Sequence, residues 1–251
     1  MAERLQPGAT LSGVDLSDID WTDRELADLV LVGCTLTDAQ LSGVNLQGAR
    51  FKDCRLVRCR FASADLREAM FEDCSFADDG PAHVGAQFAF SQMDQTRFAR
   101  CDLSFARIER CGLYGVEMTD CNLRGAVFQG VDFGKAFGRK VIRCAAIFSA
   151  CNLELADLRE ARLPGCSLAG SNLREADLSG ADLENADLSG CDLFQAFTQA
   201  ARMAGADLRN AEVSGLNLLQ LGSVEGMYVG GDQQRRLLSA MGLTVDAGPK
   251  D

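Results

Sequence analysis

The stretch Ala176–Gly190 reads ADLSG ADLEN ADLSG, three units of five residues that follow one another directly. On an α-helix, residues five apart are rotated by about 140°, so the leucines of these units would spiral around the helix and form no apolar stripe. On a flat strand, an odd step sends successive leucines to opposite faces. A chain that turns a corner once per unit, however, returns each leucine, and the alanine two residues before it, to a common axis. The repeat therefore predicts a solenoid whose coils hydrogen-bond to one another about 4.8 Å apart.

The five-residue step runs through most of the chain. From Leu11 to Phe76, every fifth residue is Leu or Phe except for Trp21. The register is lost at Pro81, resumes from Phe88 to Phe133, is lost again, and returns from Phe148 to Leu218. These three blocks predict one elongated domain, because an unbroken repeat builds a rod instead of several globular cores.

Two insertions interrupt this register. Seven extra residues, Asp79–Gly85, predict a projecting loop. The second interruption, residues 134 to about 143, has Gly138 and Arg143 at the expected centres. An insertion of ten residues leaves the register unchanged, so the segment either bulges out or stays in the rod as two poor repeats. Its sequence, GKAFGRKVIR, is basic and punctuated by glycine, which favours a loop.

The N-terminal end is open to two interpretations. Arg24 and Leu29 occupy the slot two residues before a centre, where a small residue is expected. Residues 9–33 are therefore either solenoid, the favoured interpretation, or a short helix that Thr22 and Glu25 open as a capping box and that runs through Leu31.

At the C-terminal end the five-residue step stops after Leu218. Asp232 is a candidate N-cap, residues 233–241 a candidate helix, and Gly242 its stop signal. So short a helix must pack its apolar side on something, which is either the last coil or a second copy of the chain.

Composition limits the possible functions. The 251 residues carry a net charge of −11, which disfavours direct binding to DNA or to an anionic membrane. The chain contains no apolar run of 18 residues, and its first thirty residues do not resemble a signal peptide, so we expect a cytoplasmic protein. The acidity either reflects a well-solvated surface or allows the protein to compete with nucleic acid for a basic groove.

Catalytic and metal-binding motifs are absent from the sequence. Ten of the 11 cysteines occupy the small-residue slot, with Cys144 as the exception, so we expect buried thiols, no disulfides and no zinc site. The only residues near the single histidine, His83, in the sequence that could assist catalysis are aspartates. We therefore predict no enzyme activity and no cofactor. The Asp or Asn that precedes many centres suits a corner, because its side chain hydrogen-bonds to nearby backbone.

Three segments carry a resemblance to a known family. They are FEDCSF at 71–76 with the acidic loop after it, GRKVIRCAAIFSACNL at 138–153, and DQQRRLLSAMGLTV at 232–245. With the repeat, they resemble the pentapeptide-repeat family and, within it, the Qnr quinolone-resistance proteins. The resemblance implies an all-β fold, a right-handed four-sided β-helix of about ten coils with two projecting loops and a short C-terminal helix. The β-helix would occupy residues 1–222, with loops at about 78–85 and 134–143, and the tail residues 223–251.

The resemblance also implies a function. Qnr-like proteins are homodimers joined at their C-terminal ends; they imitate DNA, bind DNA gyrase and topoisomerase IV, and relieve quinolone poisoning. Carried over, the partner-binding residues are Asp78, Asp79, Gly80, Pro81, His83, Lys135, Phe137, Gly138, Arg139 and Lys140. The dimer contact would comprise Leu237, Leu238 and Met241.

This sequence departs from the family pattern in three ways. It has some 28 additional N-terminal residues, a first loop about one residue longer, and Arg143 at an apolar centre. Two alternatives also stay open: immunity against a natural topoisomerase toxin, and a general protein-interaction scaffold.

Overall fold

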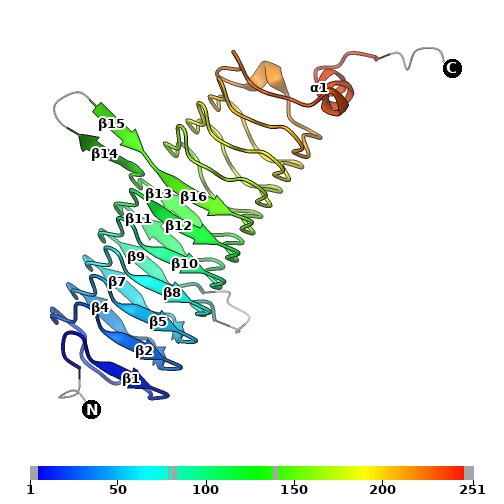
Figure 1. Cartoon of the computed structure of the whole chain (residues 1–251). Helices are drawn as coiled ribbons and strands as arrows, with labels where there is room; N and C mark the ends of the chain where they lie inside the picture. Colours follow the sequence, from blue (N-terminus) through cyan, green and yellow to red (C-terminus); the bar gives the residue numbers. More distant parts are fainter. Residues whose placement is uncertain (1–4, 79, 81–83, 138–140, 246–251) are drawn as a thin grey trace.

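The computed structural model describes residues 5–78, 80, 84–137 and 141–245, which form an elongated β-helix (Figure 1). Parallel pairs join residues that are 20 positions apart, as in the ladder Val30–Arg50–Met70. Twenty residues are four five-residue units, so each coil has four faces and each unit supplies one. The four-sided β-helix that the resemblance implies is confirmed.

Short parallel strands form the faces of the first coils. The first face contains β1 (Thr10–Ser12), β2 (Val30–Val32), β5 (Arg50–Lys52), β8 (Met70–Glu72), β10 (Arg97–Ala99), β12 (Val116–Thr119) and β16 (Ala146–Ser149). The second face contains β3 (Thr35–Thr37) and β6 (Arg55–Val57). The third contains β4 (Gln40–Ser42), β7 (Arg60–Ala62), β9 (Gln87–Ala89), β11 (Arg107–Glu109) and β13 (Val127–Gln129). Single bridges continue the ladders beyond Ser149.

The repeat unit explains the coil. Leu183 and Ala181 are fully buried, and burial of a leucine side chain contributes roughly 1.5–3 kcal/mol. The Leu183 N–H donates to the Arg202 carbonyl in the next coil at 2.8 Å, and the Ala181 N–H closes the corner on Leu178 at 3.0 Å. The last residue of a unit has a left-handed backbone, as Asn185 does with a φ of 56°, which Gly and Asn tolerate best.

Phenylalanines at equivalent centres stack along the rod axis. The ring centroid of Phe71 lies 4.7 Å from that of Phe51 and 4.9 Å from that of Phe98, and Phe61 stacks on Phe88 at 4.8 Å. Such pairs contribute about 0.5–1.5 kcal/mol each beyond the area they bury. The rings therefore stack over three successive coils on the first face and over two on the third.

The register of the paired strands gives the length of both insertions. Met70 pairs with Arg97, 27 positions on, and Glu117 with Ile147, 30 positions on, so seven and ten residues leave the regular coil. The seven-residue insertion is as predicted. The second segment does not stay in the rod as two poor repeats: it is an antiparallel hairpin of β14 (Gly134–Phe137) and β15 (Val141–Cys144) that projects from the rod (Figure 1).

At the N-terminal end, residues 9–33 are solenoid, and the alternative of a capping helix is wrong. Glu25 bridges to Asn45, and β1 pairs with β2. Leu29 is fully buried, so the inward slot accommodates a leucine there.

At the C-terminal end the coil runs further than the sequence predicts. Arg202 bridges to Ser223 and Asp207 to Tyr228, which are 21 positions apart. One extra residue, close to the 3-10 turn η2 (Leu218–Gln220), shifts the register and hides these last units from a strict five-residue count. The predicted boundary at residue 222 is therefore too early.

The C-terminal helix exists, but Asp232 does not cap it. A 3-10 turn, η3 (Gly231–Gln233), contains Asp232 and leads into α1 (Gln234–Ala240). The side chain of Gln233 accepts from the Gly230 N–H at 2.5 Å and so caps the start of η3, whereas α1 itself begins at Gln233 without a side-chain cap. Gly242, with a φ of 83°, ends the helix as predicted. Over the described ranges, no helix has the length and apolar character to span a membrane.

Candidate functional site: two insertions and the C-terminal end

The two insertions leave the rod at opposite corners. The first lies between Phe76 on the second face and β9 on the third. The hairpin follows Phe133, which continues the fourth face, and returns to β16 on the first. The structure therefore does not bring the two predicted loops together. A partner that touches both must reach around the rod or contact two sides of it.

Arg58 anchors the first loop. Its guanidinium bridges Asp38 at 2.6 Å and Asp78 at 2.8 Å, and the Asp78 carboxylate accepts from the Gly80 N–H at 3.1 Å. These hydrogen bonds, from Arg58 first, hold the pKa of Asp78 below its ordinary value. The loop closes where the Asp78 N–H donates to the Val84 carbonyl at 3.1 Å. The other predicted contact residues of this loop, Asp79, Pro81 and His83, lie outside the described residues.

Side chains of the rod hold the base of the hairpin. Lys135 forms an ion pair with Asp94 at 2.9 Å, and its ammonium lies 5.5 Å from the centre of the Tyr114 ring. Phe137 meets Tyr114 edge to face at 5.7 Å and is 47% exposed; the guanidinium of Arg143 lies 5.9 Å from its ring centre. Lys135 and Phe137 thus share one anchor, and Phe137 still presents ring surface to a partner. Gly138, Arg139 and Lys140 lie outside the described residues.

At the C-terminal end, α1 packs on the last coil of its own chain. Leu237 is buried in the common core, whereas Leu238 is exposed and Met241 is half-buried. Gln233, also buried, donates to the carbonyls of Leu208 and Ala211, each at 2.7 Å. Leu237 thus packs within its own chain, although it was predicted at the dimer contact. Further exposed apolar side chains lie around this end: Phe197, Leu219, Val224, Tyr228 and Leu243. Sequence reasoning missed these residues because several lie beyond the last recognised repeat.

The charge is unevenly distributed along the rod. Residues 150–229 contain 12 acidic and five basic residues, a net charge of −7, and residues 1–49 have a net charge of −6. Residues 50–149 contain 13 acidic and 15 basic residues, a net charge of +2. Both insertions therefore leave the rod in its electrically balanced middle, and acidic coils lie on either side of that middle.

The turn aspartates have the predicted local role. The carboxylate of Asp177 accepts from the Ser179 N–H at 3.0 Å, and that of Asp187 from the Ser189 N–H at 3.0 Å. Along the second face, amides take the same position and link the coils: Asn122 donates to Asp102, Asn152 to Asn122, and Asn172 to Asn152, at 3.0–3.2 Å. The fold by itself thus accounts for a large part of the acidic content.

The thiols behave as core residues. Ten cysteines are buried, and Cys144, at the base of the hairpin, is half-buried. Burial raises the pKa of Cys59 and of Cys191 to about 12, so these groups stay protonated and unreactive at neutral pH. Among the described residues, no three His, Cys, Asp or Glu side chains lie together in a group that could hold a metal ion.

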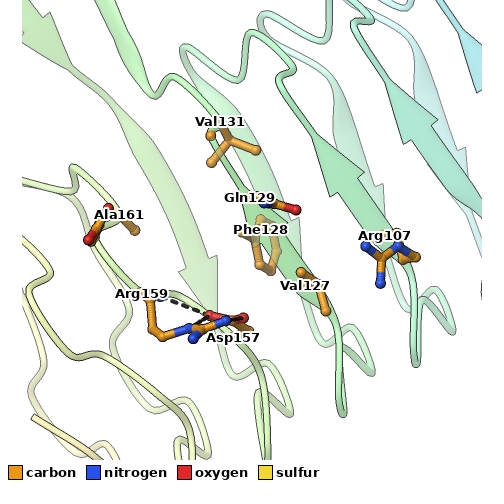
Figure 2. A pocket seen from close by; sticks show the side chains of 10 residues that line it. Arg107, Val127, Phe128, Gln129, Val131, Asp157, Arg159 and Ala161 are labelled. Atoms are coloured by element: carbon orange, nitrogen blue, oxygen red, sulfur yellow. Dashed lines mark hydrogen bonds and ion pairs between the residues drawn. The ribbon is translucent and has the colours of Figure 1, made fainter.

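Open clefts lie on the rod surface. One, of about 500 Å³, lies beside β13 and is lined by Arg107, Val127, Val131, Arg159 and Ala161, among others (Figure 2). Another, of about 530 Å³, runs from Asp28 to Tyr114 at the foot of the hairpin. Neither contains an arrangement of nucleophile and base that would support catalysis.

Comparison with known proteins supports the repeat assignment. The family model described as pentapeptide repeats matches residues 8–48, 39–78, 101–137, 151–190 and 186–218. The chain belongs to the pentapeptide-repeat family. The quinolone resistance pentapeptide repeat protein QnrB96 of Scandinavium goeteborgense is 30% identical over 105 residues, 42% of this chain and 49% of that protein. The pentapeptide repeat protein QnrB4 of Escherichia coli is 27% identical over 95 residues, 38% of this chain and 44% of that protein. The matched segment thus spans about half the length of these relatives.

Solved structures extend the likeness to the whole fold. Full-length QnrB1, described as a plasmid-mediated fluoroquinolone resistance protein, superposes with a TM-score of 0.70 at 23% identity, over 93% of this chain and 97% of that one. A trypsin-treated QnrB1 variant gives a TM-score of 0.67 at 24% identity, over 94% and 97%. At these identities the likeness concerns the fold. The chain therefore resembles the QnrB proteins in its fold and, over about 100 residues, in its sequence.

Proposed function

We propose that this protein binds type II topoisomerases, DNA gyrase and topoisomerase IV, and protects them from quinolone poisoning without catalysing a reaction. The observation that carries the proposal is the combination of an acidic β-helical rod with two insertions at its balanced middle. The resemblance to proteins named for quinolone resistance supports the choice of target.

The charge distribution suggests a division of labour. The coils of residues 150–229, with a net charge of −7, would face the cationic surface on which the enzyme holds DNA. The hairpin carries Lys135 and Arg143 and an exposed Phe137 ring, so it would contact protein beside that surface instead of continuing the imitation of DNA. The shape and charge of the rod would fit the groove in which the enzyme holds DNA, and the insertions would determine which enzyme is bound.

A homodimer joined at the C-terminal ends is part of the proposal. Leu238, Leu219 and Leu243 expose apolar surface around α1, and a stable dimer needs such a patch at its centre. Two copies joined there would place both acidic segments next to each other and the hairpins further out. Replacement of Leu238 and Leu243 by glutamate should convert the dimer to a monomer in sedimentation equilibrium, whereas wild-type-like dimerisation of that variant would contradict this arrangement.

The decisive experiment is DNA supercoiling by gyrase in the presence of ciprofloxacin. The intact protein should restore supercoiling at micromolar concentrations. A variant lacking residues 134–143 should protect poorly although it folds, because removal of ten residues places Phe133 five positions from Phe148 and restores a regular repeat. Absence of protection by the intact protein would refute the proposal.

A charge variant tests the acidic segment separately. Glu160, Glu175 and Glu225 are exposed, and their replacement by glutamine removes three charges without removing bulk. This variant should bind gyrase more weakly than the intact protein, and the difference should shrink as salt is raised. If the variant and the intact protein bound gyrase equally well at both low and high salt, the imitation of DNA would be contradicted.

A further inference from the structure

One rung of the β-helix is open. The ladders of the first and second faces run continuously from Thr10 to Tyr228 and from Asp15 to Glu212. The fourth ladder runs from Glu25 to Asp132, stops, and resumes at Arg162. On the neighbouring third face the same two coils remain paired, Val127 with Asp157. The opening is therefore confined to one side of the rod.

The backbone hydrogen bonds identify the N–H and carbonyl groups that have no partner across the coils at the opening. In the next rung, Glu160, Leu163 and Asp182 donate across the coils to Ser179, Asp182 and Ala161 at 2.8–3.0 Å. The equivalent donors at the open rung are the N–H groups of Gly130, Phe133 and Arg162. Within the described ranges, none of these three makes a backbone hydrogen bond to the opposite coil. The carbonyls of Val131, Arg159 and Arg162 are their unmatched acceptors.

The hairpin and the local core explain why this rung opens. The chain leaves the coil at Gly134, immediately after the rung, and the N–H of Ala145, between β15 and β16, donates to the Phe133 carbonyl at 3.1 Å. Three rings pack together in this part of the core, those of Phe128 and Phe133 in one coil and that of Phe148 in the next, with centroids 5.9–6.5 Å apart. The bulk of the rings and the departing hairpin hold the two coils apart on the fourth face.

The 500 Å³ cleft adjoins this opening on the side of the third face: Gly130, Val131 and Arg159 line it, whereas Phe133 and Arg162 do not. Val131 lies on one side of it and Ala161 on the other; Arg159 lies beside Asp157, and Arg107 lies farther away, beyond Val127 (Figure 2). Val131 is half-buried, whereas the residues in its slot one coil before and after, Cys111 and Ala161, are buried. The cleft volume lies within the range of about 300–1,000 Å³ that is usual for ligand sites.

We propose that the open rung is a strand-addition site for an extended segment of a protein partner that carries an acidic side chain. The segment would donate to the free carbonyls and accept from the free N–H groups, as peptides do when they extend an exposed sheet edge. Unpaired donors and acceptors on both lips favour a backbone that presents both kinds of group in alternation. This site is independent of the topoisomerase proposal, because it is defined by the interrupted ladder.

The acidic residue follows from the two arginines. Arg107 binds Glu109 through Nε and Nη2, and both bonds go to one carboxylate oxygen; Arg159 binds Asp157 through the same two nitrogens. For the described residues, the Nη1 groups of both arginines have no hydrogen bond. A carboxylate beside either arginine would receive a charge-assisted bond from its Nη1, while the apolar faces of Val127, Val131 and Ala161 would contact the neighbours of the acidic residue.

The test uses a capped pentapeptide, threonine-valine-aspartate-valine-threonine, added to the isotope-labelled full chain and followed by NMR. Before peptide is added, the amides of Gly130, Phe133 and Arg162 should exchange with solvent at least about tenfold faster than those of Glu160, Leu163 and Asp182. Peptide should shift the three open-rung amides in a saturable way, with a Kd of about 0.1–1 mM, and slow their exchange.

Three controls separate the site from non-specific contact. A peptide with N-methylated valines should not bind, because it lacks the ladder donors. The variant lacking residues 134–143 should close the rung and lose the response. Arg107→Gln should weaken binding of the aspartate peptide about threefold to tenfold. It should leave unchanged the binding of the same peptide with asparagine in place of aspartate.

Slow exchange of the open-rung amides in the free protein would overturn the proposal. Equal binding of the N-methylated peptide, or no saturable shift at millimolar peptide, would do the same. Since none of these measurements involves gyrase, their outcome is separate from that of the supercoiling assay.

Discussion

Replacement of Tyr114 by alanine should release the hairpin from the rod. An isolated two-stranded hairpin is marginally stable in water, so β14 and β15 depend on their contacts with the rod. Tyr114→Ala removes the edge-to-face contact with Phe137 and the ring under the Lys135 ammonium. These two contacts contribute about 0.5–1.5 and 0.5–1 kcal/mol, respectively, so the hairpin should lose about 1–2.5 kcal/mol of docking free energy.

The assay is amide hydrogen exchange, resolved for β14 and β15. The loss should speed exchange in these strands by about 5- to 70-fold, while the strands of the rod keep their rates. Tyr114→Phe retains the ring and should exchange like the wild type. Tyr228→Ala removes the other tyrosine, near the C-terminal end, and should leave the hairpin unchanged. A change of less than about twofold in Tyr114→Ala, or an equal change in Tyr114→Phe, would refute the reasoning.

Three further predictions follow from the core, the tail and the first loop. Phe71→Leu keeps an apolar centre but loses two stacked contacts, so urea unfolding should show a loss of about 1–3 kcal/mol; an unchanged midpoint would argue against stacking. Gln233→Ala leaves the carbonyls of Leu208 and Ala211 without their donor, which should cost α1 about 1–3 kcal/mol of docking, visible as faster exchange of its amides. The folded-state pKa of Asp78 is lowered by Arg58, so its contribution is complete above the unfolded value near 3.8 and is lost as the pH falls below that value. The Gly80 amide resonance should therefore stay constant from pH 7 to about 5 and move below 3.8, and Arg58→Gln should raise the midpoint.

Most of the rod was predictable because its signal is local. A centre such as Leu183 is buried wherever it occurs, and the corner bond of Ala181 involves neighbours in the sequence. The same locality hid the last coil, since one extra residue before Ser223 breaks a strict count although the ladder continues. Capping by Gln233 was also missed, because its side chain acts over three residues and across to Leu208, 25 positions away.

The insertions show where sequence periodicity loses its power. Ten inserted residues keep the register, so only the pairing of Gly134 with Cys144 distinguishes a hairpin from two weak repeats. The anchor of Lys135 on Asp94 joins residues 41 positions apart and leaves no local pattern. The open rung between Asp132 and Arg162 is harder still to predict, because each lip taken alone has an ordinary sequence.

The turn position that Asp102, Asn122, Asn152 and Asn172 share has a consequence for evolution. Aspartate and asparagine differ there by one oxygen-for-nitrogen exchange, and both offer the oxygen that accepts from the backbone two residues on. A single codon change can thus add or delete one unit of charge while the coil is preserved. A lineage could therefore change the surface charge of its rod step by step through folded intermediates.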